Sequence, residues 1–189
     1  MASAVLRPNT VSLHGPMERR LVEELIRKAC NRDKEAFADL VRLCTPDLYK
    51  VARAILRNDM DVADAMQETL LACWEKLGDL RDERYFKTWV TRILINKCYV
   101  VLRNQAKRPQ CEIPEDMGAS DESLAEVEWR LLLDELDDKH RLVIVLHYVM
   151  GYKVSEIATL IGTNENTVKS RLVVARKRYG EALQRAERP

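Results

Sequence analysis

The stretch 151–179 constrains the fold most, because a helical pattern of apolar residues lies on each side of Gly162. In its first part, apolar residues recur one turn apart and predict a helix with one buried face: Val154, Ile157, Ala158 and Ile161. Gly162 can adopt the left-handed conformation that ends a helix. Thr163 or Asn164 then offers an oxygen that caps a following helix. The stretch therefore predicts a helix-turn-helix.

The second helix of this motif separates an apolar stripe from a basic face. The stripe consists of Val168, Leu172, Ala175, Tyr179 and Leu183. The residues left facing outward are Asn166, Lys169, Ser170, Val173, Arg176 and Lys177. A recognition helix presents such side chains to base edges and phosphates in a major groove. The alternative is a merely solvated helix face, and it is disfavoured because residues 168–180 contain no Asp or Glu.

Composition favours an all-α fold. The 189 residues include only six Gly and six Pro, and no segment alternates apolar and polar residues for long. The formal net charge of +1 means that a nucleic-acid binder of this kind must segregate its charges along the chain. No apolar run could span a bilayer and no signal peptide is visible, so we expect a cytoplasmic protein. The five Cys and three His show no ligand spacing, so neither a metal nor a cofactor is expected.

The N-terminal half reads as four helices. We expect helices over 17–30 and 34–44, the second capped by Asp33, and a new helix that starts at Pro46 because proline disfavours helix interiors. The helix expected over 61–77 has an acidic outer face with one leucine: Asp61, Asp64, Gln67, Glu68, Leu71 and Glu75. Such a face is either a solvated surface or a docking surface for a basic partner, and the residues alone favour the solvated surface.

A second basic element follows. Residues 84–111 contain seven Lys or Arg and no Asp or Glu, and most of this segment predicts a helix. One face of that helix combines cations with an amide and an aromatic ring, as binding of melted DNA requires: Arg92, Asn96, Tyr99 and Arg103. The alternative, core aromatics with merely solvating charges, fits this helix equally well. We place Trp89 in the core under either interpretation.

The composition changes abruptly after this helix. Residues 109–124 have no apolar period and read as a linker, and every charge from Glu112 to Glu128 is negative. We therefore expect two small helical domains joined by a flexible acidic linker. Their predicted bounds are a flexible arm at 1–16, a first domain at 17–108, the linker at 109–124 and a C-terminal domain with the helix-turn-helix at 125–189.

Taken in order, these motifs resemble the bacterial extracytoplasmic-function class of sigma factor. The resemblance rests on DVADAMQETLLACWEKL, FKTWVTRILINKCYVVLRN, the acidic linker and GYKVSEIATLIGTNENTVKSRLVVARKR, and spans roughly residues 33–183. It implies an alternative sigma factor that binds core RNA polymerase and directs promoter-specific initiation, within a stress or envelope response. It also implies promoter DNA and an anti-sigma factor, commonly membrane-anchored, as further partners, and little promoter affinity until core polymerase unmasks the chain.

The resemblance assigns roles to particular residues. It turns the acidic face into a polymerase-binding surface with Asp64, Gln67 and Glu68 as contacts. It assigns the minus-ten element to Arg84, Arg92, Asn96, Lys97 and Arg103. It assigns the minus-thirty-five element to Asn166, Lys169, Ser170, Arg171, Val173, Arg176 and Lys177, with Arg171 on phosphate. The chain departs from the family pattern at Asn164 and Asn166, where Pro and Gly are common, and at the cap residue Lys153.

Two other classes of function compete with this interpretation. A helix-turn-helix regulator that acts without being a polymerase subunit explains residues 151–179, but leaves the basic helix and the acidic linker without a role. An enzyme would need a nucleophile with a partnered base, a phosphate-cradling glycine loop or a metal site, and the sequence shows none of these patterns. We therefore expect no enzymatic activity.

Overall fold

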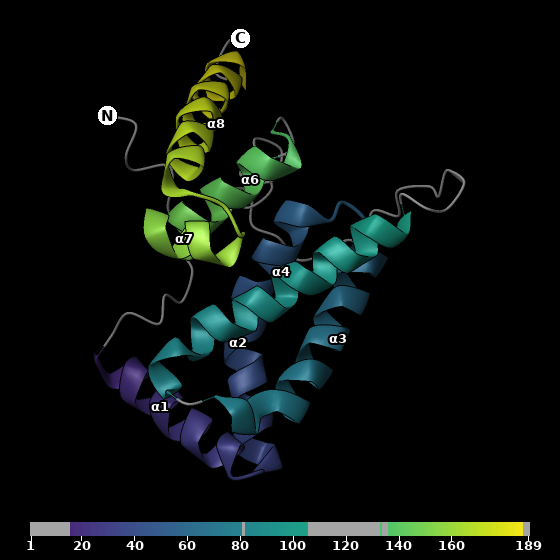
Figure 1. Cartoon of the computed structure of the whole chain (residues 1–189), viewed down its shortest axis with the longest axis vertical. Helices are drawn as coiled ribbons and strands as arrows, with labels where there is room; N and C mark the ends of the chain where they lie inside the picture. The colour runs from purple at the N-terminus through teal and green to yellow at the C-terminus, as the bar shows by residue number, and fades with distance from the viewer. Residues whose placement is uncertain (1–15, 81, 106–132, 134–135, 187–189) are drawn as a thin grey trace.

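The computed structural model describes residues 16–80, 82–105, 133 and 136–186, and every regular element in these ranges is a helix. The expected all-α class is confirmed, with two helical domains (Figure 1). The first group of helices is α1 (Pro16–Cys30), α2 (Lys34–Ile55), α3 (Asp59–Lys76) and α4 (Phe86–Gln105). The second group is α6 (Asp138–Ile144), α7 (Val154–Leu160) and α8 (Glu165–Ala186). The expected linker at 109–124 lies outside the described residues.

Helix α2 corrects one expectation, because it runs unbroken through Pro46. A proline inside a helix removes one backbone hydrogen bond and costs about 3 kcal/mol. Packing offsets this cost, since Leu40 before the proline and Leu48 and Val51 after it are all buried in the same core. The predicted cap at Asp33 is confirmed, because its side chain accepts hydrogen bonds from the first backbone amides of the helix.

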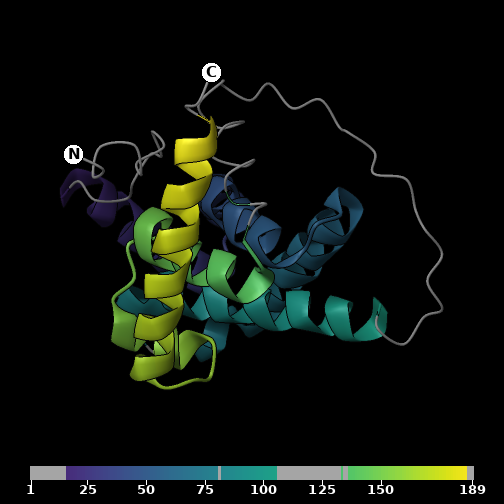
Figure 2. The same cartoon turned by 90° about the horizontal axis from the view of Figure 1, so that it is seen from above.

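Helices α2, α3 and α4 form the body of the first domain. Asn58 caps α3, and the inner face of α3 buries Val62, Ala65 and Cys73. Two short 3-10 turns, η1 (Leu77–Asp79) and η2 (Glu83–Tyr85), lead from α3 to α4. Trp89 is half-buried and packs against the core, as expected. In the view from above, α8 and α3 lie toward opposite sides of the molecule (Figure 2).

In the second domain, the Asp137 side chain caps α6, which continues into the π-helical segment η3 (Val145–Val149). Gly151 has a positive φ of 73° and turns the chain toward α7. A second left-handed glycine, Gly162, separates α7 from α8 with a φ of 66°. Both turns need a conformation that residues with a Cβ adopt at a cost.

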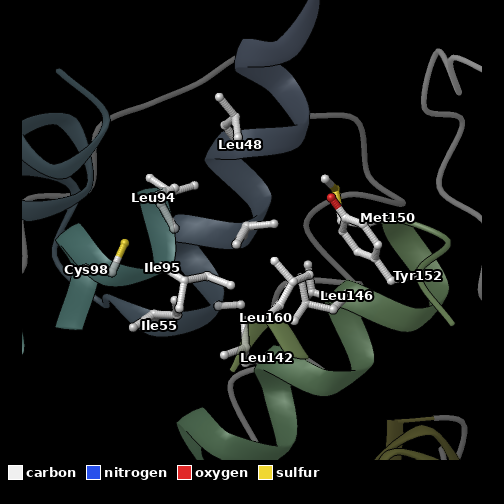
Figure 3. Packing of buried hydrophobic residues seen from close by; sticks show 14 of the residues in the cluster. Leu48, Ile55, Leu94, Ile95, Cys98, Leu142, Leu146, Met150, Tyr152 and Leu160 are labelled. Carbon is white, nitrogen blue, oxygen red and sulfur yellow. The ribbon is translucent and has the colours of Figure 1, made fainter. Parts of the chain in front are cut away.

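The two domains share one continuous apolar core. Ile95 of α4 points toward Leu142 and Leu146 of the second domain, and all three side chains are buried (Figure 3). Helix α6 packs on α2, and α7 packs on α4. We refer to this contact between the domains as the seam. Among the described residues, no helix is long and apolar enough to cross a membrane.

Candidate nucleic-acid interface

The helix-turn-helix forms where the sequence predicts it. Asn164, one of the two candidate caps, accepts a hydrogen bond from the Thr167 amide at 2.8 Å and starts α8. The inner stripe of α8 is buried through Val168, Leu172 and Ala175. Lys153 provides no side-chain cap for α7, but its backbone N–H donates to Glu156 at 2.7 Å. This hydrogen bond is one half of a capping box, and it takes the place of the side-chain cap that a hydroxyl residue would provide.

The outer face of α8 is open to solvent. Six of the seven residues predicted for the minus-thirty-five element are exposed: Asn166, Lys169, Ser170, Val173, Arg176 and Lys177. Val173 stands out, because 63% of its surface is exposed although it is apolar. Arg171 is different, since it is half-buried and lies near Tyr99 of α4. Burial raises the pKa of Tyr99, and the nearby Arg171 charge opposes that shift.

Three cations on α8 have a carboxylate nearby. Lys169 lies 3.9 Å from Glu165, Lys177 lies 3.9 Å from Glu181, and Arg178 lies 3.2 Å from Asp137. Exposed ion pairs of this kind contribute about 0 to 1 kcal/mol and exchange easily for another anion. A DNA phosphate can therefore take the place of these carboxylates at little cost.

The outer face of α4 carries a shallow hollow of about 560 Å³. Its lining combines an amide, an aromatic ring and a guanidinium with apolar side chains: Asn96, Tyr99, Val100, Leu102 and Arg103. Arg92 is also exposed on this helix. Aromatic stacking, amide contacts to base edges and cation contacts to phosphate are the interactions that bind an unpaired strand.

Two of the residues predicted for the minus-ten element are engaged with carboxylates. Lys97 donates to Glu68 of α3 at 2.9 Å, which joins this surface to the predicted polymerase-binding face. Arg84 donates to both carboxylate oxygens of Asp82. The hydrogen bond from Arg84 holds the pKa of Asp82 below its usual value. The structure therefore gathers Arg92, Asn96 and Arg103 on one helix and holds Arg84 and Lys97 in ion pairs.

The predicted polymerase-binding residues are exposed on α3: Asp64, Gln67 and Glu68. An apolar groove of about 300 Å³ lies beside them, and the sequence interpretation missed it. Its walls include Phe37 of α2 and Trp74 of α3, whose ring centroids lie 4.9 Å apart. The spacing of Gln67, Leu71 and Trp74 by four and three residues places them on one helix face, and that spacing was the available signal.

The seam is closed by polar contacts that sequence periodicity did not reveal. Lys87 of α4 donates to the Met150 carbonyl at 2.8 Å, and its ammonium lies 5.5 Å from the centre of the Tyr152 ring. The Tyr152 hydroxyl lies 3.0 Å from Thr91 Oγ1. Burial lowers the pKa of Lys87 and raises that of Tyr152 to about 12. Arg141, only 2% exposed, donates to the Ala54 carbonyl at the end of α2.

Two family models match this chain. The model described as Sigma-70 region 2 matches residues 40–108. The model described as "Sigma-70, region 4" matches residues 126–178. RNA polymerase sigma factor NccH of Alcaligenes xylosoxydans xylosoxydans is 30% identical to this chain, and the match covers 87% of this chain and 96% of NccH. The chain belongs to the sigma-70 family of RNA polymerase sigma factors. ECF RNA polymerase sigma factor SigM of Mycobacterium tuberculosis is 29% identical, and the match covers 89% of this chain and 88% of SigM. This similarity supports the extracytoplasmic-function class.

Solved structures of sigma factors match both domains. CnrH in complex with the cytosolic domain of CnrY superposes with a TM-score of 0.63 and 27% identity, over 89% of this chain and 99% of CnrH. RpoE of Bartonella quintana in complex with the anti-sigma factor NepR also gives a TM-score of 0.63, with 25% identity over 80% of this chain and 98% of RpoE. These matches support a sigma factor over a regulator that acts without polymerase. Sigma factors are initiation factors and not enzymes, so the chain acts through binding.

Proposed function

We propose that this sigma factor uses three separate surfaces during initiation. The outer face of α3 docks on core RNA polymerase, the outer face of α4 captures the melted minus-ten element, and the outer face of α8 reads the minus-thirty-five element as duplex. The predicted contact residues are those named for each element in the sequence analysis. The observation that carries the proposal is the division of α8 into an inner face that buries Val168, Leu172 and Ala175 and an open basic outer face.

The chemistry of α8 supports duplex reading. Lys169, Val173 and Arg176 follow one another by four and three residues, so they share one face of the helix. A lysine and an arginine can bind guanine or phosphate, and an exposed valine between them can contact a thymine methyl group. We assign Arg171 to a phosphate contact that becomes available only when the second domain separates from the first, because Arg171 is half-buried near α4 in this structure.

The chemistry of α4 supports capture of an unpaired strand. The hollow beside Tyr99 offers a ring for stacking, and Asn96 and Arg103 offer hydrogen bonds from either side. Removing a base from the stack costs a few kcal/mol, which such contacts must offset. Lys97 can join these contacts once Glu68 has turned to a basic partner.

The chemistry of α3 supports docking on a basic partner. Asp64 and Glu68 supply negative charge, and the groove next to Gln67 supplies apolar surface. Leu71 borders that groove and is 59% exposed. Interfaces commonly combine a small apolar centre with a polar rim. A helix of core polymerase that carries basic residues around an apolar side chain matches this arrangement.

The closed seam supports the expectation that the free chain binds promoters poorly. The two promoter elements lie about 25 base pairs apart, or about 85 Å at 3.4 Å per base pair. Helices α4 and α8 cannot reach both elements while α7 and α6 pack on the first domain. Core polymerase would thus open the seam before both elements are bound.

A partner that keeps the seam closed is the natural regulator of such a chain. RpoE of Bartonella quintana is in complex with an anti-sigma factor, and CnrH is in complex with a cytosolic domain of CnrY. Both superpose on this chain across its two domains. By analogy, we propose an anti-sigma factor with a membrane anchor, a role in an envelope or stress response, and a cytoplasmic location for the sigma factor itself.

Transcription from a randomised promoter library, with purified core polymerase and this chain, tests the proposal. We expect selection at both promoter elements. The variant Lys169→Ala with Ser170→Ala should change the preferred sequence at minus-thirty-five and leave polymerase binding unchanged. The variant Gln67→Lys with Glu68→Lys should lose co-purification with core polymerase. Normal polymerase binding by the second variant would refute the α3 docking face, and an unchanged preference in the first would refute the α8 assignment.

A further inference from the structure

Arg176 differs from Lys169, Lys177 and Arg178 in the group that it contacts, which is not a carboxylate. Its Nε–H donates to the Tyr148 hydroxyl at 2.5 Å, and its guanidinium carbon lies 5.6 Å from the centre of that ring. Tyr148 belongs to η3, 28 residues earlier in the chain. The guanidinium therefore has two contacts with one side chain, a hydrogen bond and a cation–π contact.

A phenol holds an arginine without neutralising it. A carboxylate partner would cancel the positive charge and would compete with a phosphate or a base edge for the same N–H groups. A phenol hydroxyl carries no formal charge that could neutralise the guanidinium. Arg176 thus keeps its full charge for an incoming anion, whereas Lys169 and Lys177 must first leave their carboxylates.

The hydrogen bond uses the part of the guanidinium that DNA recognition does not need. An arginine has five N–H donors in a fixed plane. With Nε–H engaged by Tyr148, the two terminal amino groups have no hydrogen-bond partner among the residues that the structure describes. Those two groups form the paired donors that bind O6 and N7 of guanine, or two oxygens of a phosphate.

Tyr148 is itself held in place. It is half-buried, and its ring meets His147 edge-on with centroids 4.8 Å apart at 77°. His147 in turn has Nδ1 at 2.9 Å from the Tyr152 carbonyl oxygen. A carbonyl oxygen only accepts, so Nδ1 carries the proton and donates. The ring of Tyr148 therefore offers a fixed support for the longer and more flexible arginine.

We propose that Tyr148 is a positioning residue for recognition of the minus-thirty-five element, because it fixes the Arg176 guanidinium with both terminal amino groups toward the DNA. This inference rests on the proposed function, which assigns Arg176 to that element. Tyr148 need not touch DNA. Its contribution is to order Arg176 before binding, which removes part of the entropy loss that binding would otherwise cause.

A double-mutant cycle in the holoenzyme tests the inference. Tyr148→Phe removes the hydroxyl and keeps the ring, Arg176→Ala removes the guanidinium, and a third variant carries both changes. The measurement is the affinity of core polymerase with full-length sigma for a promoter with its preferred minus-thirty-five element. A matched promoter with that element scrambled is the control. We expect Tyr148→Phe to weaken binding about three- to tenfold on the first promoter only, because Arg176 must then be ordered at the moment of binding.

The cycle separates positioning from general stability. If Tyr148 acts through Arg176, Tyr148→Phe has no further effect once Arg176→Ala is present. Equal weakening in both backgrounds, no weakening at all, or tighter binding by Tyr148→Phe would each overturn the inference. Tighter binding would mean that Tyr148 withholds Arg176 from DNA. If Arg176→Ala itself leaves binding unchanged, the assignment of Arg176 in the proposed function fails instead. Equal unfolding midpoints of Tyr148→Phe and the parent chain verify that the fold is intact.

Discussion

Helices α4 and α8 look alike in sequence, as long basic helices, but the structure uses them differently. Helix α4 buries a broad face in the shared core, through residues such as Val90, Leu94 and Cys98, and its Lys87 lies in the seam. Helix α8 buries only the narrow stripe that includes Val168 and Leu172. In the proposed function, α4 thus serves as scaffold and strand-binding surface together, whereas α8 serves mainly to read the duplex.

This difference extends to the charges. On α4, Lys97 donates a hydrogen bond to Glu68 of α3, so whether Lys97 can contact DNA depends on what α3 binds. On α8, the partners of Lys169 and Lys177 lie one turn away on the same helix and are exposed. Helix α4 is therefore suited to act after polymerase has docked. In the proposed function, α8 needs only the opening of the seam.

The largest expected difference between the two helices is in stability. Leu94→Ala on α4 should lower the free energy of unfolding by about 2 to 5 kcal/mol, because it leaves a cavity in the core shared by both domains. Val173→Ala on the outer face of α8 should change it by less than about 0.5 kcal/mol. Urea unfolding followed by circular dichroism measures both. Similar destabilisation of the two variants would show that the outer face of α8 is packed and not open.

Thiol reactivity sharpens the same contrast. Burial raises the pKa of Cys98 on α4 to about 12, so its thiolate forms only as the pH approaches that value. A cysteine introduced by Val173→Cys on α8 should have a pKa near the ordinary value of about 8.5. At pH 8 we expect the introduced thiol to alkylate more than a hundredfold faster than Cys98, as measured by peptide mass spectrometry. Comparable rates at that pH would contradict the buried position of Cys98.

The smallest expected difference concerns salt. Removing one cation that binds a duplex phosphate should reduce the dependence of log affinity on log salt by about 0.9. Lys169→Ala on α8 should show a change of that size in holoenzyme binding to promoter DNA. Lys97→Ala on α4 should show a smaller change, because an unpaired strand releases fewer counterions than a duplex does. A larger change for Lys97→Ala would reverse the order that we assign to the two helices.

The local parts of the fold were predictable from sequence. The caps at Asp33 and Asn164, the left-handed turn at Gly162 and the buried stripe of α8 depend on residues only a few positions apart. The break expected at Pro46 was wrong, because packing on both sides of the proline outweighs the local loss of one hydrogen bond. The exposure of the predicted outer face of α8 followed from the same periodicity.

The seam could not be predicted in this way. Lys87 and Met150 are 63 residues apart in sequence, and Arg141 and Ala54 are 87 residues apart. No periodic pattern links such residues, and a lone arginine in an apolar helix gives no sign of its partner. The ion pair between Glu68 and Lys97 could not be predicted for the same reason, although the sequence analysis assigns each residue to a surface. The groove beside Trp74 needed both α2 and α3 to be placed.

The distance between the two domains tests the central claim most directly. Asn104 on α4 and Thr159 on α7 are both exposed and can carry bio-orthogonal spin labels. Double electron–electron resonance then measures the distance between the two labels. In the free chain we expect one short distance, within about 40 Å, because α7 packs on α4 and α4 is only about 30 Å long. In the promoter-bound holoenzyme the distance should lengthen toward the spacing of the two elements, about 85 Å. An unchanged short distance in that complex, with transcription intact, would contradict the account.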